Sequence, residues 1–177
     1  MGNTIQLAQS KDKETVKEIL YQSASWLNDK GSKQWAGLLK GEDVHNIEDA
    51  IKNEEVFLVY RSSLLIGTFA LWDTQTKWDS DFWGEDLSDK KYYLHRIALT
   101  KEAHGKNLGK ELVTSAMQVA NENKKDEIRL DCIANNSYLN SFYKNNGFSY
   151  YSTVHDYYNG EGVDDYNLYI WKVLKKC

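Results

Sequence analysis

Apolar and polar residues recur along the chain with two periods, and each period predicts one kind of element. Where apolar residues return every three or four positions, one face of a helix is apolar. Two segments follow this pattern clearly, and capping residues and glycines mark two further helical stretches. The predicted helices run from Asp12 or Thr15 to about Asn28, over 33–53 with a break near Gly41, over Lys106–Asn123 and from Asn136 to about Asn146.

Other segments are rich in β-branched and aromatic residues and are bounded by turn residues, which predicts strands. They are residues 3–7, Val56–Arg61, Leu64–Trp72, Tyr92–Leu99, Ile128–Ile133, Phe148–Tyr158 and Tyr166–Leu174. The order predicts an α+β fold, with an antiparallel meander followed by a strand–helix–strand crossover. Two acidic loops remain, Asp73–Lys91 and Asn159–Asp165, and the first also carries aromatic residues.

Composition narrows the class of protein. A chain of 177 residues that is 41% hydrophobic and 27% charged is typical of one globular domain, here 1–177. The net charge of −4 argues against nucleic acid as the main partner, and no apolar run is long enough to span a membrane. We expect a cytoplasmic protein, since there is no apolar signal region and Cys132 and Cys177 make no disulfide framework.

The segment Leu94–Gly109, LHRIALTKEAHGKNLG, carries the strongest functional signal. An apolar strand leads through a charged turn into a glycine-bearing segment that opens an amphipathic helix. Exposed backbone N–H groups and the partial positive charge of a helix N-terminus bind anions. The residues alone therefore predict a site for a phosphate-bearing ligand.

Three pieces in order make the chain resemble the GNAT superfamily of N-acetyltransferases. YYLHRIAL resembles the family's central strand, and HGKNLGKELV resembles its pyrophosphate loop, Arg/Gln-x-x-Gly-x-Gly/Ala. NNSYLNSFYKNNGF resembles its Asn-x-x-Ala-x-x-Leu-Tyr-x-x-x-Gly-Phe signature. Two residues depart from the pattern, because His104 stands where Arg or Gln is usual and Asn107 replaces a glycine. Asn tolerates positive φ, so we expect the loop to keep its shape and its backbone donors.

The resemblance implies a single GNAT domain whose mixed, mostly antiparallel sheet is splayed at its centre and flanked by helices on both faces. It implies direct acetyl transfer from acetyl-CoA to a primary amine. The backbone of Ile97, Ala98 and Leu99 would hold the pantetheine arm, and a Leu99 N–H would polarise the thioester carbonyl. The implied pyrophosphate loop consists of His104, Gly105, Lys106, Asn107, Leu108, Gly109 and Lys110.

By the same resemblance, Tyr143 is the general acid that protonates the leaving thiolate, whereas the alternative is a ring packed beside Phe142 and Phe148. Asn136 is a helix N-cap, and by resemblance its side chain also reaches the pantetheine arm. His95 is the titratable candidate for the general base, and a purely structural histidine is the alternative. Carboxylates of the first acidic loop could act through water instead: Asp79, Asp81, Glu85 and Asp86.

The acidic and aromatic loops predict a small cationic amine as the acceptor, such as a polyamine, an aminoglycoside or a lysine side chain, with Trp26 and Trp35 completing a wall. The alternative is that these loops are merely solvated. We keep open a longer acyl donor, a protein lysine or N-terminal acetyltransferase, a non-catalytic acyl-CoA sensor, and a homodimer. The spacing of His, Cys and Asp predicts no metal site, and Cys132 lacks an activating base.

Overall fold

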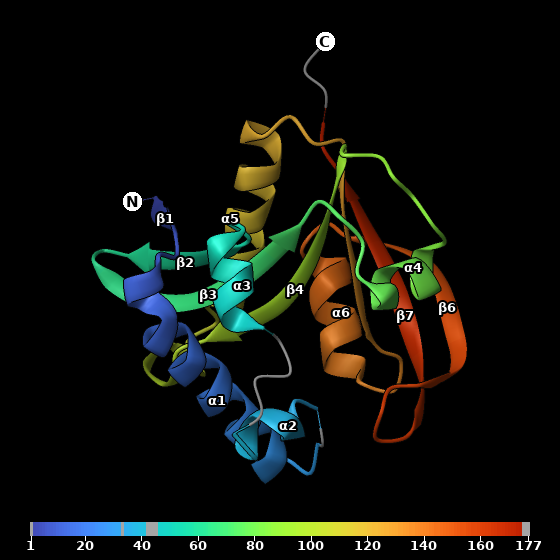
Figure 1. The fold of residues 1–177 in the computed structure, drawn as a ribbon, viewed down its shortest axis with the longest axis horizontal. Helices are drawn as coiled ribbons and strands as arrows, with labels where there is room; N and C mark the ends of the chain where they lie inside the picture. Colours follow the sequence, from blue (N-terminus) through green and yellow to red (C-terminus); the bar gives the residue numbers. More distant parts are fainter. Residues whose placement is uncertain (1, 33, 42–45, 175–177) are drawn as a thin grey trace. The chain divides into compact units, whose positions relative to one another are not determined.

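The computed structural model describes residues 2–32, 34–41 and 46–174. Seven strands form one mixed sheet in the order β1-β2-β3-β4-β5-β7-β6. The strands are β1 (Asn3–Leu7), β2 (Val56–Arg61), β3 (Leu64–Trp72), β4 (Lys91–Leu99), β5 (Glu127–Ile133), β6 (Ser149–Tyr158) and β7 (Val163–Lys172). The helices are α1 (Lys13–Asp29), α2 (Ala36–Leu39), α3 (Ile47–Lys52), α4 (Lys77–Trp83), α5 (Gly109–Glu122) and α6 (Ser137–Asn145), with single 3-10 turns η1 (Ser10–Asp12) and η2 (Lys101–Ala103) (Figure 1).

Contacts group the chain into two compact units, each described by itself below. The first comprises residues 1–71 and 95–115, and the second comprises 72–94 and 116–177. Strand β4 contributes its beginning to the second unit and its end to the first. The prediction of one domain over 1–177 stays a prediction.

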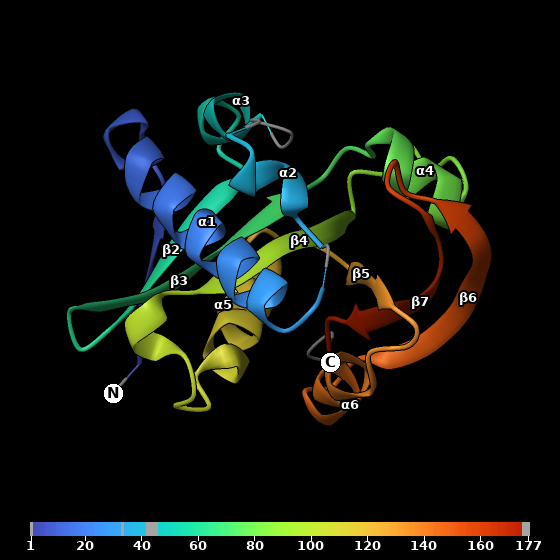
Figure 2. The ribbon, with the colours of Figure 1, turned by 90° about the horizontal axis from the view of Figure 1, so that it is seen from below.

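In the first unit, β1, β2 and β3 form an antiparallel meander. The apolar face of α1 packs on β2 through residues such as Val16, Leu20 and Leu58. Successive side chains of a strand point to opposite faces of the sheet. The residues of β2 and β3 next to these core positions therefore point away from α1, and Gly67 among them faces Leu112 of α5. Figure 2 accordingly shows α1 and α3 on one side of β2 and β3, and α5 on the other.

In the second unit, β7 pairs antiparallel with both β5 and β6. Residues along β7 alternate between two faces. Tyr166 and Leu168 join the aromatic cluster of α4, whereas Asn167 and Tyr169 donate hydrogen bonds to Asn140 of α6. The two helices therefore cover opposite faces of β7, and Figure 2 shows β6 and β7 as a long curved hairpin.

Most predicted elements are present, and the differences have local causes. Helix α4 lies inside the predicted loop Asp73–Lys91, where Thr76 and Asp79 form a capping box. Helix α5 begins at Gly109 rather than Lys106, because positive φ at Asn107 is not helical. Strand β7 begins at Val163, so it takes in the end of the predicted acidic loop Asn159–Asp165. The helical stretch predicted over 33–53 is two short helices, and residues 33 and 42–45 lie outside the described part.

The fold class is confirmed as α+β, with an open seven-stranded mixed sheet and flanking helices. Strands β4 and β5 pair in parallel over Lys91–Tyr93 and Glu127–Arg129. In the described part of the second unit this ladder stops there, while β5 continues along β7 to Ile133. Within the described residues, none of the helices is long and apolar enough to cross a lipid bilayer.

Candidate active site

The loop between β4 and α5 has the backbone shape of an anion site. After the turn η2, the chain is extended at His104 and enters the left-handed region at Gly105, with φ of 74°, and again at Asn107, with φ of 56°. Nothing lies within 4 Å of a Cβ built on Gly105, so the glycine serves conformation rather than space. The expectation that Asn107 tolerates positive φ is confirmed.

The first turn of α5 completes this loop. Since the first N–H groups of a helix lack intrahelical acceptors, the 14-residue helix α5 offers backbone donors at its start. Lys106 and Lys110 are exposed on either side of Gly109, and Leu108 is buried beneath them. Backbone donors, a helix N-terminus and two cations form a donor set that suits a diphosphate.

Helix α1 supports the same loop from within the first unit. The ring of Trp26 packs against that of His104, with centroids 5.3 Å apart. The Lys101 N–H donates to the side chain of Gln22 at 3.3 Å. Ala103 is fully buried. His104, the unusual residue of the motif, is thus placed by Trp26, and Trp35 packs on the core of the first unit. The expected role of the two tryptophans as an acceptor wall stays a prediction.

The end of β4 is irregular just before the residues predicted to hold the pantetheine arm. Arg96 has φ of 54°, which interrupts the alternation of the strand. Beyond it, Ala98 is buried and Ile97 and Leu99 are half-buried. The strand end is held to β3, because the Thr100 N–H donates to the Ile66 carbonyl at 2.9 Å. A bulge at this strand end, which would free backbone groups for the pantetheine arm, stays a prediction.

In the second unit, Asn136 begins α6. Its side-chain oxygen accepts the Leu139 N–H at 3.0 Å, so the predicted N-cap is confirmed. The capping bond occupies the amide oxygen. A second duty of Asn136 toward the pantetheine arm would therefore fall to its Nδ2 group, and that duty stays a prediction.

Tyr143 lies in the next turns of α6 and is buried. Its ring packs edge-on against Phe142 and Phe148 and at a tilt against Tyr169. Tyr143 thus packs beside Phe142 and Phe148, as the alternative interpretation predicts, and this packing does not exclude a role as general acid. Burial first, and then the charges of Cys132 and Asp131, raise the pKa of the Tyr143 phenol, so the proton is retained at neutral pH.

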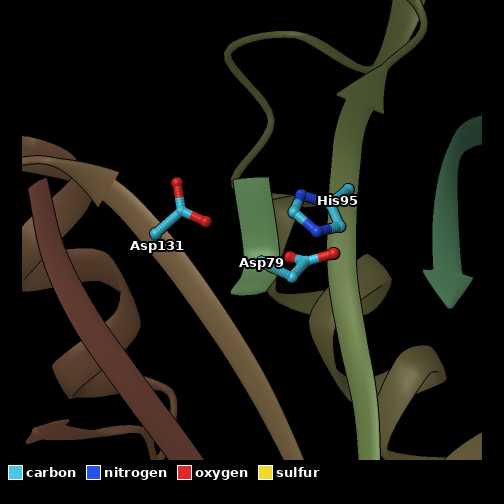
Figure 3. A group of neighbouring side chains, drawn as sticks. All are labelled: Asp79, His95 and Asp131. Carbon is cyan, nitrogen blue, oxygen red and sulfur yellow. The ribbon is translucent and has the colours of Figure 1, made fainter. Parts of the chain in front are cut away.

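Two aspartates of the second unit, Asp79 of α4 and Asp131 of β5, lie close together (Figure 3), with one carboxylate oxygen of each within 4.8 Å of the other. Asp79 is 1% exposed and accepts from the Thr76 N–H and hydroxyl through Oδ2, and Asp131 Oδ1 accepts from the Trp78 indole at 3.1 Å. A pair of carboxylates is of the type that can ligate a cation. His95, the predicted general base, is half-buried on β4 in the first unit.

The sequence did not predict this pair of carboxylates. Asp131 lies within a strand that was identified by its apolar residues, so it was not considered as a site residue. Asp79 was one of four acidic loop residues proposed to act through water. Of the others, Asp81 pairs with Lys77 and Asp86 pairs with Lys91. The capping box Thr-x-x-Asp at Thr76 was the signal that could have singled out Asp79.

A separate pocket of about 470 Å³ opens where β5 ends and β7 begins. Two carboxylates line it and are held by their neighbours. Asp164 accepts from Asn159 at 2.9 Å, and Asp165 accepts from the Asp156 N–H and pairs with His155. The hydrogen bond from the Asp156 N–H is the main cause that lowers the pKa of Asp165, so its carboxylate stays charged. The other lining residues are Ile133, Ala134, Asn135 and Val163.

Comparison with known proteins decides the family. Residues 20–148 match the family model described as the acetyltransferase (GNAT) family. The chain belongs to the GNAT family. It is 36% identical over 140 residues to the uncharacterized N-acetyltransferase YesJ of Bacillus subtilis strain 168, covering 79% of this chain and 78% of that protein.

Solved structures agree with this membership. A GNAT-family acetyltransferase from Listeria monocytogenes 4b F2365 aligns with a TM-score of 0.78 and 33% identity, over 97% of this chain and 95% of that one. The PaiA N-acetyltransferase of Thermoplasma acidophilum, solved in complex with coenzyme A, aligns with a TM-score of 0.61 and 22% identity over 98% and 100% of the chains. The latter shows the shared fold.

As a GNAT protein, the chain is an acetyl-CoA-dependent N-acetyltransferase, and acetyl-CoA is its cosubstrate. The donor set from His104 to Lys110 fits the diphosphate of that molecule. Direct transfer needs no enzyme nucleophile, and Cys132 is unsuited to be one. Burial raises the pKa of its thiol to about 12, so the reactive thiolate is scarce at neutral pH.

Proposed function

We propose that this GNAT enzyme transfers the acetyl group directly to a primary amine of a small cationic molecule. The observation that carries the proposal is the pocket at the end of β5, whose carboxylates Asp164 and Asp165 are oriented by hydrogen bonds and one of which has a lowered pKa. Fixed carboxylates attract an ammonium group and raise its local concentration. Polyamines and aminoglycosides carry several such groups, so one can bind while another reacts.

The donor is held by the first unit in this proposal. Acetyl-CoA supplies the acetyl group as an activated thioester. The loop of Gly105, Asn107 and Gly109 binds its diphosphate through backbone N–H groups, and Lys106 and Lys110 add charge. The Leu99 N–H donates to the thioester carbonyl and stabilises the negative charge that develops on its oxygen.

Proton transfer falls to two residues. An alkyl amine has a pKa near 10.4, so forming the neutral nucleophile at pH 7 costs about 4.6 kcal/mol. His95 accepts this proton as the general base. As the C–S bond breaks, Tyr143 donates its phenolic proton to the departing thiolate and regains one from the nitrogen of the tetrahedral intermediate, which becomes the amide. The raised pKa of Tyr143 means that its phenol is protonated at neutral pH, before this step.

A panel assay tests the acceptor class. Free thiol release from acetyl-CoA is measured with polyamines, aminoglycosides, amino acids and lysine-containing peptides. We expect the highest kcat/KM with a polyamine or an aminoglycoside. We also expect the Asp164→Asn and Asp165→Asn pair to raise KM for that amine by about tenfold without changing KM for acetyl-CoA. A reaction with neutral or acidic acceptors only would refute a cationic acceptor, and a preference for peptides would favour a protein acetyltransferase.

The role of His95 has its own test. The His95→Gln variant keeps a side chain that can hydrogen-bond but cannot take up a proton at neutral pH. We expect kcat to fall by about 100-fold, within the usual range for a lost general base. Wild-type turnover in the variant would show that His95 is structural.

A further inference from the structure

A buried asparagine on α6, Asn140, makes several hydrogen bonds, which a residue that only fills space in the core would not need. Asn140 is 8% exposed, and its side-chain amide uses both ends. Its Oδ1 accepts from the Tyr169 hydroxyl at 2.6 Å and from Asn167 Nδ2 at 2.7 Å, with the Cys132 thiol at 3.5 Å. Its Nδ2 donates to the Asn136 carbonyl at 2.7 Å and to the Ile133 carbonyl at 3.1 Å.

These partners come from three elements. Ile133 and Cys132 end β5, Asn136 is the N-cap of α6, and Asn167 and Tyr169 belong to β7. One amide therefore fixes the first turns of α6 against both strands. The set extends outward, because the Thr153 hydroxyl of β6 donates to Asn167 Oδ1 at 2.7 Å and so fixes the orientation of that second amide.

An asparagine inside a helix is not explained by helix propensity, since Asn disfavours helix interiors. It is not explained by apolar packing either, because it sits among Cys132, Tyr143 and Tyr169, where an aliphatic side chain would fill the space. Buried amides are stabilising only when all their groups have partners, and such networks define one arrangement of the elements they join. Asn140 specifies how α6 sits on β5 and β7.

The residue that depends on this placement is Tyr143. It follows Asn140 by three positions, so both side chains lie on the same side of α6. Its ring touches that of Tyr169, whose hydroxyl is held by Asn140. Within the described residues the Tyr143 hydroxyl makes no hydrogen bond, so its position rests on the packing of its ring and on the placement of α6.

We propose that Asn140 is a positioning residue that sets the site of the Tyr143 hydroxyl through its bonds to β5 and β7. The inference rests on the proposed function, in which Tyr143 is the general acid. A displacement of a catalytic group by about 1 Å can cost up to 100-fold in rate. Loss of the Asn140 amide should therefore lower turnover without weakening the binding of acetyl-CoA.

The test is a double-mutant cycle between Asn140→Leu and Tyr143→Phe, read as thiol release from acetyl-CoA with and without an amine. Asn140→Leu keeps the size of the side chain and removes its polar groups, and Asn145→Leu makes the same change at an exposed position of α6. We expect Asn140→Leu to lower kcat by at least about tenfold and to change KM for acetyl-CoA less than about threefold. In the Tyr143→Phe background it should lower kcat less than about twofold, because the group it positions is already gone.

Milder variants keep the test valid if Asn140→Leu does not fold. Asn140→Asp retains the acceptor oxygens and loses the donor, and Tyr169→Phe removes one hydroxyl, so both should show the same coupling at a smaller size. Equal losses in both backgrounds would overturn the positioning role while leaving the proposed function intact. Wild-type turnover of Tyr143→Phe would instead refute the general acid, and the positioning role with it.

Discussion

The left-handed conformation of Asn107 gives a direct way to test whether the loop binds the cosubstrate by its backbone shape. The family pattern has glycine here, and Asn107 holds φ of 56°. A β-branched residue strongly disfavours this region, and a left-handed conformation costs most L-residues about 1–2 kcal/mol. If the loop must keep this conformation to bind coenzyme A, Asn107→Val should weaken binding by the same free energy, which is about 5–30-fold in Kd.

Titration calorimetry with coenzyme A measures this effect, and Asn107→Gly is the matched control. Glycine adopts positive φ without strain, so the control should bind as tightly as the wild type or tighter. Both variants lose the amide of Asn107, and they differ in the backbone conformations that they prefer and in side-chain size. Equal Kd values for Asn107→Val and the wild type would show that the N–H groups of this loop do not hold the diphosphate, and the reasoning from its shape would fail.

Three further predictions concern the surroundings of the site. Gly67→Ala would place a Cβ 2.4 Å from the Ala98 carbonyl oxygen, so we expect a loss of about 3 kcal/mol and a Tm lower by about 6–12 °C, while Gly162→Ala changes little. An unchanged Tm would contradict the close approach of β3 and β4. Cys132→Ala should retain turnover, because the raised pKa of this thiol excludes a nucleophilic role; loss of all turnover would contradict direct transfer. Since burial raises the pKa of Tyr143, its deprotonation should not lower kcat at any pH below about 10. A fall in kcat near pH 8 that is absent from Tyr143→Phe would contradict this.

The strand and helix pattern was readable from the sequence where one periodicity dominated. Helix α5 and strand β5 follow single apolar patterns, and both are present. Helix α4 was missed because its aromatic residues, read as part of an acidic loop, in fact pack on β7. A seven-residue helix held by tertiary contacts leaves a weak periodic signal, and its capping box was the only local sign.

The residues of the candidate site also differ in how far the sequence could predict them. Gly105, Asn107 and Asn136 act through local backbone conformation and capping, so their positions could be inferred from neighbouring residues. The pairing of Asp131 with Asp79 and the network of Asn140 depend on contacts between distant segments, and nothing in the spacing of these residues indicates them. The contact of Trp26 with His104 was not predicted for the same reason, and the expected use of Trp26 against the acceptor stays a prediction. The single-domain, homodimer and cytoplasmic expectations stay predictions.

The central claim is that this GNAT chain is an acetyl-CoA-dependent enzyme whose Tyr143 acts in the chemical step. Thiol release from acetyl-CoA by the wild type and by Tyr143→Phe, together with the Kd of each for coenzyme A, tests it most directly. We predict a kcat at least about 100-fold lower in the variant with a Kd within about twofold of the wild type. Equal turnover in both proteins, or tight binding of coenzyme A without thiol release by the wild type for any amine, would contradict the claim.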